Sequence, residues 1–329
     1  MRAFLPRECL APWLERQRER MEVIAPVLEC GAPVFTAWGG QRLALEGNPL
    51  MPPSELLLPL REVLFRYEQD CGRYSFQEPD PVPRMIFGIR PCDLQALAVL
   101  DRILGTPPAD RPYIERRRST VIVACSCTEP EEGCFCASLG SGPMAVDWFD
   151  LELTELSEGF LVRTGSSAGV VLIVESRDLF REAGQSEIRE RDEVLRRAAG
   201  MIQARGAPSL PQIREAIERA DWEALARRCL GCGSCTYLCP ICHCFTIHDL
   251  GVPDGERLRC RDTCLLSGFS RMAGGINPYP EMGSRLENWY RDKFCYTPQR
   301  TGLTGCVGCG RCSRACLGGF ERWSLEVRG

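Results

Sequence analysis

The chain contains very little lysine and histidine. Of its 40 basic residues only Lys293 is a lysine, and His243 and His248 are its two histidines. Two histidines are too few for a histidine-rich metal site, and a Ser-His-Asp hydrolase would have to rely on one of them. Covalent catalysis by lysine would depend on Lys293 alone. We therefore expect chemistry that uses neither residue type as its reactive group.

Long hydrophobic runs are also missing. The longest apolar stretches, such as Val170 to Val174, have the length of a strand, far below the roughly 20 residues that span a bilayer. The segment from Met1 to Gln17 is mixed in charge and lacks the apolar core of a secretory signal. The net charge is -4, with acidic and basic residues interleaved, so no basic face is evident. We expect a cytoplasmic protein with neither a membrane nor a nucleic-acid partner.

Motifs for nucleotide binding and hydrolysis are absent from the sequence. It has no G-x-G-x-x-G after a predicted strand, no P-loop and no nucleophile elbow. The glycine-rich segment 138–143 lacks the following helix that a phosphate site needs. Neither nucleotide chemistry nor hydrolysis therefore has a visible site in this chain.

Cysteine, in contrast, is abundant, with 21 residues. Two runs with the spacing C-x2-C-x2-C-x3-C occur at 229–239 and 306–316. Three closely spaced thiolates and a displaced fourth suit an iron–sulfur cube better than a zinc site, which usually takes two separated pairs. A zinc ribbon would leave the third and fourth cysteines of each run idle. In a reducing compartment the thiols stay free for metal, so the spacing predicts two [4Fe-4S] clusters.

The fourth cysteine of each such run ligates the cluster of the other run. This rule predicts a first cysteine set and a second cysteine set, one for each cluster. The first set is Cys229, Cys232, Cys235 and Cys316, and the second set is Cys306, Cys309, Cys312 and Cys239. Four more cysteines lie between the runs: Cys242, Cys244, Cys260 and Cys264. For these we favour packing around the clusters, with a further metal site as the alternative.

The first two hundred or so residues have the pattern of a mixed α/β domain. Segments 84–89 and 120–124 are short apolar strands, and a helix with apolar residues at helical spacing lies between them, with Asp93 as its expected cap. Strand, helix and strand in this order predict a crossover that makes the two strands parallel. We also expect strands at 160–163 and 169–174.

Five cysteines follow the two expected parallel strands. Cys92 follows the first strand, Cys125 and Cys127 follow the second, and Cys134 and Cys136 come shortly afterwards. The carboxyl ends of parallel strands meet at one edge of a sheet, where ligands of such sheets bind. We therefore predict a possible third cluster on a third cysteine set, namely Cys92, Cys127, Cys134 and Cys136, with Cys125 as the substitute for Cys127. Small buried side chains without metal are the alternative.

Two charged amphipathic helices are expected at 178–205 and 211–228. We place a domain boundary between them, which gives an α/β domain at residues 1–208 and a dicluster domain at 209–329. The two cysteine runs are separated by residues 240–305, far more than the linker of a compact bacterial ferredoxin. That length suggests helices between the clusters, with loops at 251–255 and 274–280, and hence an α-helical ferredoxin-like domain.

Several motifs together resemble those of a known family. They are the segments 87–94, 127–136, 140–143, 239–245, 259–264, 273–275 and 293–294 and the closing cysteine run. The chain resembles the iron–sulfur β subunit of cytosolic bidirectional [NiFe] hydrogenases, also called sulfhydrogenases. An iron–sulfur subunit of anaerobic sulfite reductase is similar and belongs to the same dicluster family. The resemblance extends over nearly the whole chain.

The resemblance implies an electron-transfer subunit without a catalytic site of its own. Its expected partners are an FAD-containing subunit that exchanges electrons with NAD(P)H and the small and large hydrogenase subunits. In a sulfite or polysulfide reductase, a siroheme subunit would take the place of the hydrogenase subunits. A stand-alone iron–sulfur sensor is a third possibility, but the sequence has no evident effector-binding face.

Overall fold

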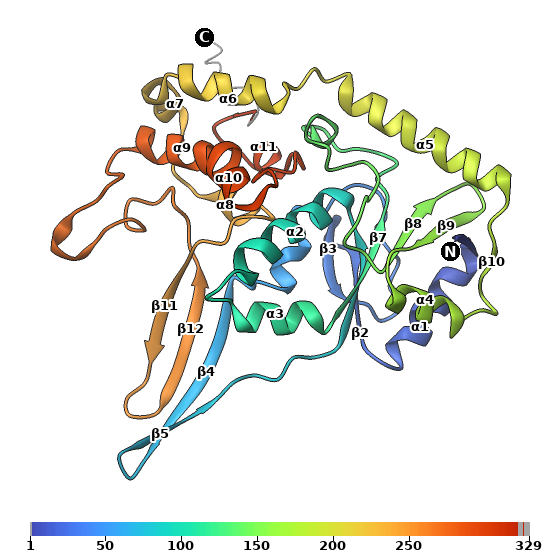
Figure 1. Ribbon diagram of the computed structural model, residues 1–329, viewed down its shortest axis with the longest axis horizontal. Helices are drawn as coiled ribbons and strands as arrows, with labels where there is room; N and C mark the ends of the chain where they lie inside the picture. Colours follow the sequence, from blue (N-terminus) through green and yellow to red (C-terminus); the bar gives the residue numbers. More distant parts are fainter. Residues whose placement is uncertain (1, 322–324, 326–329) are drawn as a thin grey trace.

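A mixed eight-stranded sheet forms the centre of the N-terminal part (Figure 1). The computed structural model describes residues 2–321 and 325. The strand order is β10-β1-β9-β8-β7-β6-β2-β3, in which β2, β6, β7 and β8 are parallel and the other pairings are antiparallel. The strands are β1 (Arg2–Pro6), β2 (Glu22–Glu29), β3 (Ala32–Ala37), β6 (Arg84–Ile89), β7 (Thr120–Cys125), β8 (Leu151–Glu155), β9 (Gly159–Thr164) and β10 (Arg181–Glu182).

The predicted crossover between two parallel strands is confirmed. Strand β6 pairs with β7 in parallel, and helix α2 (Pro91–Gly105) connects them, followed by α3 (Arg111–Arg118). The helix begins earlier than expected: Arg90, not Asp93, is the residue before its first turn. Pro91 fits that first turn because proline lacks the amide hydrogen that would stay unpaired there. Asp93 lies inside the first turn, which leaves its carboxylate for another partner.

One predicted strand is wrong. Residues 169–174 belong to helix α4 (Ser167–Val174), although the strand predicted at 160–163 lies within β9. The hydroxyl oxygen of Ser166 accepts a hydrogen bond from the Gly169 amide and caps the helix. A short apolar run cannot distinguish a strand from a helix by its periodicity, so here the cap decides the structure.

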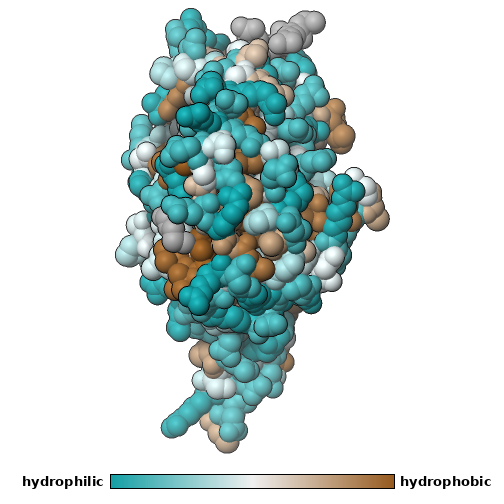
Figure 2. Space-filling view, turned by 90° about the vertical axis from the view of Figure 1, so that its right-hand side faces the viewer, coloured by the Kyte–Doolittle hydropathy of each residue, from teal (hydrophilic) through white to brown (hydrophobic). Residues whose placement is uncertain are grey.

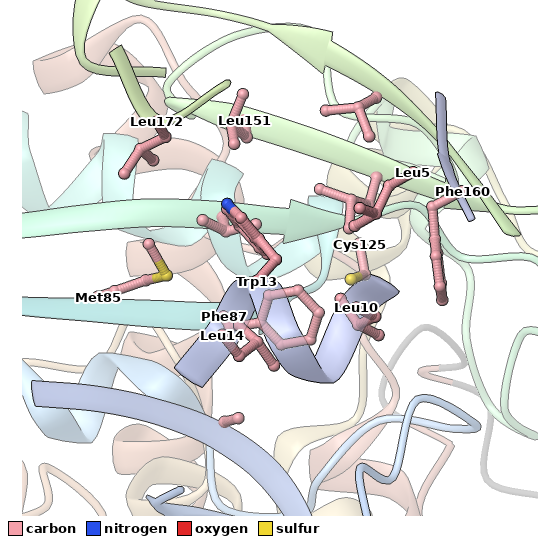
Figure 3. Packing of buried hydrophobic residues seen from close by; sticks show 14 of the residues in the cluster. Leu5, Leu10, Trp13, Leu14, Met85, Phe87, Cys125, Leu151, Phe160 and Leu172 are labelled. Atoms are coloured by element: carbon pink, nitrogen blue, oxygen red, sulfur yellow. The ribbon is translucent and has the colours of Figure 1, made fainter. Parts of the chain in front are cut away.

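Two hydrophobic cores cover the two faces of the sheet. On one face, Trp13 of α1 (Leu10–Arg18) lies edge-on against Phe87 and Phe180, with ring centroids 6.3 and 5.9 Å away. Cys125 belongs to this core, as Figure 3 shows. Leu97 and other residues of α2 pack on the opposite face. Successive residues of a strand point to opposite faces, so Cys125 is directed away from α2.

The charged helices lie along the edge of the molecule (Figure 1). Helix α5 (Gln185–Gln203) is shorter than predicted because residues 181–182 form β10 at the sheet edge. The helix predicted at 211–228 is two helices, α6 (Leu210–Arg219) and α7 (Trp222–Arg228). Asp221 separates them because its carboxylate accepts a hydrogen bond from the Ala224 amide and starts α7.

A second sheet projects from the main body (Figure 1). Its order is β11-β12-β4-β5, with β4 (Arg61–Asp70), β5 (Arg73–Gln77), β11 (Phe245–Leu250) and β12 (Gly255–Arg261). The segment between the cysteine runs therefore contains strands at 245–261, where we expected helices. After the short 3-10 helix η4 (Ala273–Gly275), longer helices follow from 282 onwards, as α9 (Met282–Arg291), the π-helix η5 (Asp292–Tyr296) and α10 (Thr297–Thr301). The loop predicted at 251–255 is the turn between β11 and β12.

The second sheet joins segments that are far apart in the sequence. Strand β12 pairs antiparallel with β4, so residues on both sides of position 208 share this sheet. A partner strand from such a distance cannot be read from local sequence periodicity. Residues 322–324 and 326–329 of the expected second domain lie outside the described residues.

The surface is mainly hydrophilic on the side shown in Figure 2, with scattered hydrophobic patches. Helix α4 exposes Val170, Val171 and Val174, so its apolar sequence is only partly used in the core. Within 2–321, no helix combines the length and the apolar composition needed to cross a bilayer.

Trp13→Ala tests the larger core. Because Trp13 is fully buried against two aromatic rings, we expect the free energy of unfolding to fall by about 3–5 kcal/mol. Anaerobic guanidinium titration followed by far-UV circular dichroism measures this change. Val171→Ala is the matched control, because Val171 is 47% exposed and its loss should change stability by less than about 0.5 kcal/mol. Equal effects of the two substitutions would contradict the assignment of this core.

Candidate metal centre

Both cysteine runs have the same local structure. Each follows the pattern C-x-G-C-G-x-C, and its two glycines have left-handed backbone angles: Gly231 (65°), Gly233 (74°), Gly308 (61°) and Gly310 (72°). Residues with a side chain rarely adopt these angles. One helical turn follows each loop, α8 (Ser234–Tyr237) in the first run and α11 (Arg311–Arg314) in the second. The repeated sequence thus presents three thiols from a tight turn in each run.

The second cysteine set surrounds one cavity. All four of its members, which come from both runs, line this cavity. Pro240, Lys293 and the aromatic rings of Trp289 and Phe294 complete the wall. Cys239, the fourth cysteine of the first run, thus lies with the cysteines of the other run, and the exchange of ligands stays a prediction.

The first cysteine set lies where the two runs meet. Cys235 is buried, Cys229 and Cys316 are half-buried, and Cys232 is exposed. Cys229, Cys235 and Cys316 pack in one hydrophobic cluster together with Cys306 and Cys312. The chain directly after Cys316 runs against the end of α7: a methyl group at Gly318 would lie 2.6 Å from the Arg228 carbonyl oxygen. The end of the second run is therefore held beside the start of the first.

The third cysteine set also surrounds a cavity. Cys92, Cys127, Cys134 and Cys136 all line this cavity, which lies at the carboxyl ends of β6 and β7. The strand–helix–strand order at 84–124 had predicted that these cysteines meet at this edge of the sheet. The substitute, Cys125, does not line the cavity and lies in the core on the other face of the sheet (Figure 3). Cys127 lies just beyond β7, and its amide donates to the Pro143 carbonyl at 2.9 Å.

The second and third cavities are neighbours. The Phe135 amide donates to the Gly308 carbonyl at 2.8 Å, and the Cys134 thiol donates to the Cys309 carbonyl at 3.5 Å. A methyl group at Gly308 would lie 2.6 Å from the Cys136 nitrogen, so only glycine permits this backbone contact. Phe135 comes between Cys134 and Cys136 in sequence, yet it lines the second cavity. The segment 134–136 thus lies between the two cavities.

The surroundings of the thiols fit a metal cluster. Burial raises the pKa of Cys134 to about 11 and that of Cys306 to about 12, and it raises the pKa of Cys92 well above its usual range. A bound metal displaces the thiol protons. Its positive charge compensates the negative charge of the thiolates, which burial disfavours. Among the described residues, no three Cys, His, Asp or Glu side chains are arranged to hold a single ion. The thiols of the second and third sets instead line two cavities, four thiols to each.

Cys239 differs from these thiols. A hydrogen bond from Cys242 and the nearby charge of Lys293 hold its pKa well below the usual range, despite burial. Lys293 Nζ lies 3.3 Å from Cys239 Sγ and 3.4 Å from Cys242 Sγ. Cys244 and Cys264 are hydrogen-bonded to each other, and Cys260 lies within β12, opposite Thr246. Cys242 thus lies beside the second cavity through Lys293, and the packing role predicted for the other three stays a prediction.

A buried ion pair, which the sequence did not reveal, lies between the second and third sets. Arg311 is fully buried within the second run and donates to both carboxylate oxygens of Asp93, at 2.5 and 2.8 Å. It also donates to the Pro49 carbonyl at 2.8 Å and to the Asn48 side chain. Asn48 in turn lies 3.8 Å from Cys92 Sγ. Asp93 follows Cys92 and Arg311 precedes Cys312 in the sequence. This closeness to predicted ligands was the only sequence feature that pointed to either residue.

Two comparisons with known proteins agree with this geometry. Residues 228–320 match the family model of a 4Fe-4S dicluster domain. The chain is also 34% identical over 286 residues to sulfhydrogenase 2 subunit beta of Pyrococcus furiosus, an alignment that covers 85% of this chain and 83% of that protein. The chain belongs to the sulfhydrogenase beta subunit family. The predicted membership is thereby confirmed, and this sulfhydrogenase-type chain is an iron–sulfur protein with a 4Fe-4S dicluster domain.

A double-mutant cycle tests the buried ion pair of this sulfhydrogenase family member. Arg311→Met leaves the Asp93 carboxylate buried without its partner, so we expect a loss of about 3–5 kcal/mol in unfolding free energy. Adding Asp93→Asn should cost less than the sum of the two single changes, because the charge that was left alone is removed too. Anaerobic denaturant titration provides all three values.

Arg219→Met is the control for this cycle. Arg219 pairs with Glu215 on the surface, where its side chain is 70% exposed, so its loss should cost less than about 1 kcal/mol. Strictly additive effects of the Asp93 and Arg311 changes would show that the pair does not act as a unit.

Proposed function

We propose that the chain is the electron-transfer iron–sulfur subunit of a multi-subunit, cytoplasmic, NAD(P)-linked [NiFe] hydrogenase. It relays single electrons between a flavoprotein subunit and the catalytic subunits. The observation that carries this proposal is the convergence of cysteines distant in sequence on shared sites, above all the second and third sets, each of which lines one cavity. The name of the Pyrococcus furiosus relative supports a hydrogenase role over a sulfite reductase role.

Three [4Fe-4S] clusters are proposed, one on each cysteine set. A bound cluster supplies one-electron redox chemistry, with a potential set by charge, hydrogen bonds to sulfur and burial. The protein supplies the thiols, the glycine turns that bring backbone close to them, and aromatic walls that exclude water from the second cavity. The proposed helical ferredoxin-like domain at 209–329 is supported by the helices before each run. These are α6 and α7 before the first run and α9 and α10 before the second.

The positions of the sets support a linear order. The segment 134–136 contributes Cys134 and Cys136 to the third cavity and Phe135 to the second, and the first and second sets share one hydrophobic cluster. The third cluster would therefore lie at one end of the path and the first cluster at the other. Cys232 is exposed while all members of the second set are buried or half-buried. The first cluster is thus the end from which an electron could leave towards a partner.

Iron content tests the number of clusters. We expect about twelve irons in each anaerobically prepared chain, and about eight after the paired change Cys134→Ser and Cys136→Ser. Cys235→Ser should weaken the first cluster and slow dye reduction. Cys125→Ser is the matched control and should leave the iron content unchanged, because this thiol lies in the core. About eight irons in the wild type would reject the third cluster, and zinc in place of iron would reject all three.

The proposed partners can be tested by affinity purification of the tagged chain from its native cells. A flavoprotein and a nickel-containing subunit should purify with it and give NAD(P)-dependent hydrogen exchange. Recovery of a siroheme protein in their place would assign the chain to a sulfite reductase. A stable monomer without a flavoprotein would contradict the role in a complex.

A further inference from the structure

The single lysine of the chain lies in its interior, at the second cavity. Lys293 is 3% exposed and belongs to the π-helix η5. Its Nζ atom donates to Cys239 Sγ at 3.3 Å, to Cys242 Sγ at 3.4 Å and to the Gly305 carbonyl at 3.4 Å. A π-helix is rare and often marks a functional site. The lysine therefore contacts one member of the second cysteine set directly.

The positive charge of Lys293 has an unusual set of partners. Within the described part of the chain, its polar contacts are two thiols and a carbonyl, and no ion pair with a carboxylate is formed. The buried Arg311 and Arg259 are different, because each pairs with carboxylates. A buried charge is costly unless it is compensated. At Lys293 the compensating charge comes first from the thiolates of Cys239, Cys242 and Cys306 and only then from the Asp292 carboxylate.

The choice of lysine over arginine has a geometric reason. The other 39 of the 40 basic residues are arginines, so composition alone would favour arginine here as well. An ammonium group is a compact point charge, whereas a guanidinium group is a planar fork. Space around Nζ is limited, since two sulfur atoms and the Gly305 carbonyl oxygen lie within 3.4 Å of it and the ring centroid of Trp289 is 5.0 Å away.

A fixed cation affects the two redox states of a cluster unequally. Reduction adds one negative charge to the cluster and its thiolates, so a nearby cation stabilises the reduced state more than the oxidised state. A hydrogen bond to a ligand sulfur acts in the same direction. Burial strengthens both effects because little water is present to screen them.

We propose that Lys293 sets the reduction potential of the cluster held by the second cysteine set and raises it through its charge and its hydrogen bond to Cys239. This inference rests on the proposed function, because it requires a cluster at that site. Lys293 is a positioning residue for electron transfer and does not bind iron itself. In the proposed linear order the second cluster is the middle one, so its potential controls passage between the two ends.

Redox titration followed by low-temperature EPR tests this role in the assembled protein. In Lys293→Met and Lys293→Gln, the ratio of reduced to oxidised second cluster at a given solution potential should fall at least about tenfold, a shift of about 59 mV to lower potential. The other clusters should keep their midpoints. Lys293→Arg keeps the charge and should recover much of the shift. Arg219→Met removes an exposed charge on α6 and should leave every midpoint unchanged.

Each outcome bears on the inference. Unchanged midpoints in Lys293→Met with full iron content would overturn it. Equal shifts in the Met and Arg variants would also overturn it when both keep full iron content, because the site would then accommodate the arginine and the charge would be irrelevant. Loss of about four irons in the Met and Gln variants would overturn it too, since Lys293 would then be needed to hold the cluster and not to set its potential. A wild type without clusters would reject the proposed function itself, which iron analysis detects separately.

Discussion

The arrangement of the cysteine sets depends on one close backbone contact. The turn of Gly308 and Gly310 lies directly against Gly133 and Cys136, where any side chain would collide with the opposite backbone. This contact joins the edge of the parallel sheet to the second cysteine run. Because the backbones touch, the thiols on either side come to line adjacent cavities.

Buried charge is handled in two ways around these cavities. Arg311 is neutralised by Asp93, and the pair connects the second run to the first turn of α2. Among the described residues, Lys293 donates hydrogen bonds to thiols and a carbonyl, so its charge stays available to the second cavity. The Arg311–Asp93 pair stabilises the position of the second and third cavities relative to each other. Lys293 acts instead on the proposed chemistry of the second cavity.

Local sequence predicted several elements well and failed where a distant partner decided the structure. The strands at 84–89 and 120–124 and the crossover between them were predicted, because each is determined by local apolar patterns. Residues 245–261 form strands because β12 pairs with β4, almost two hundred residues away in sequence. Residues 169–174 form a helix because Ser166 caps it. Apolar runs alone could not indicate either outcome.

The number and spacing of the cysteines and of the glycines between them are a matter of sequence alone. They determine the type of cofactor, because three thiols in a tight turn with a displaced fourth suit a [4Fe-4S] cluster. Family membership also followed from motifs. Only the tertiary structure decided that Cys127 and not Cys125 lines the third cavity, since Cys125 still belongs to the strand and points into the core, whereas Cys127 lies beyond the strand end. It also placed Asp93 beside Arg311, and Lys293 beside Cys239, because such contacts depend on how distant segments pack.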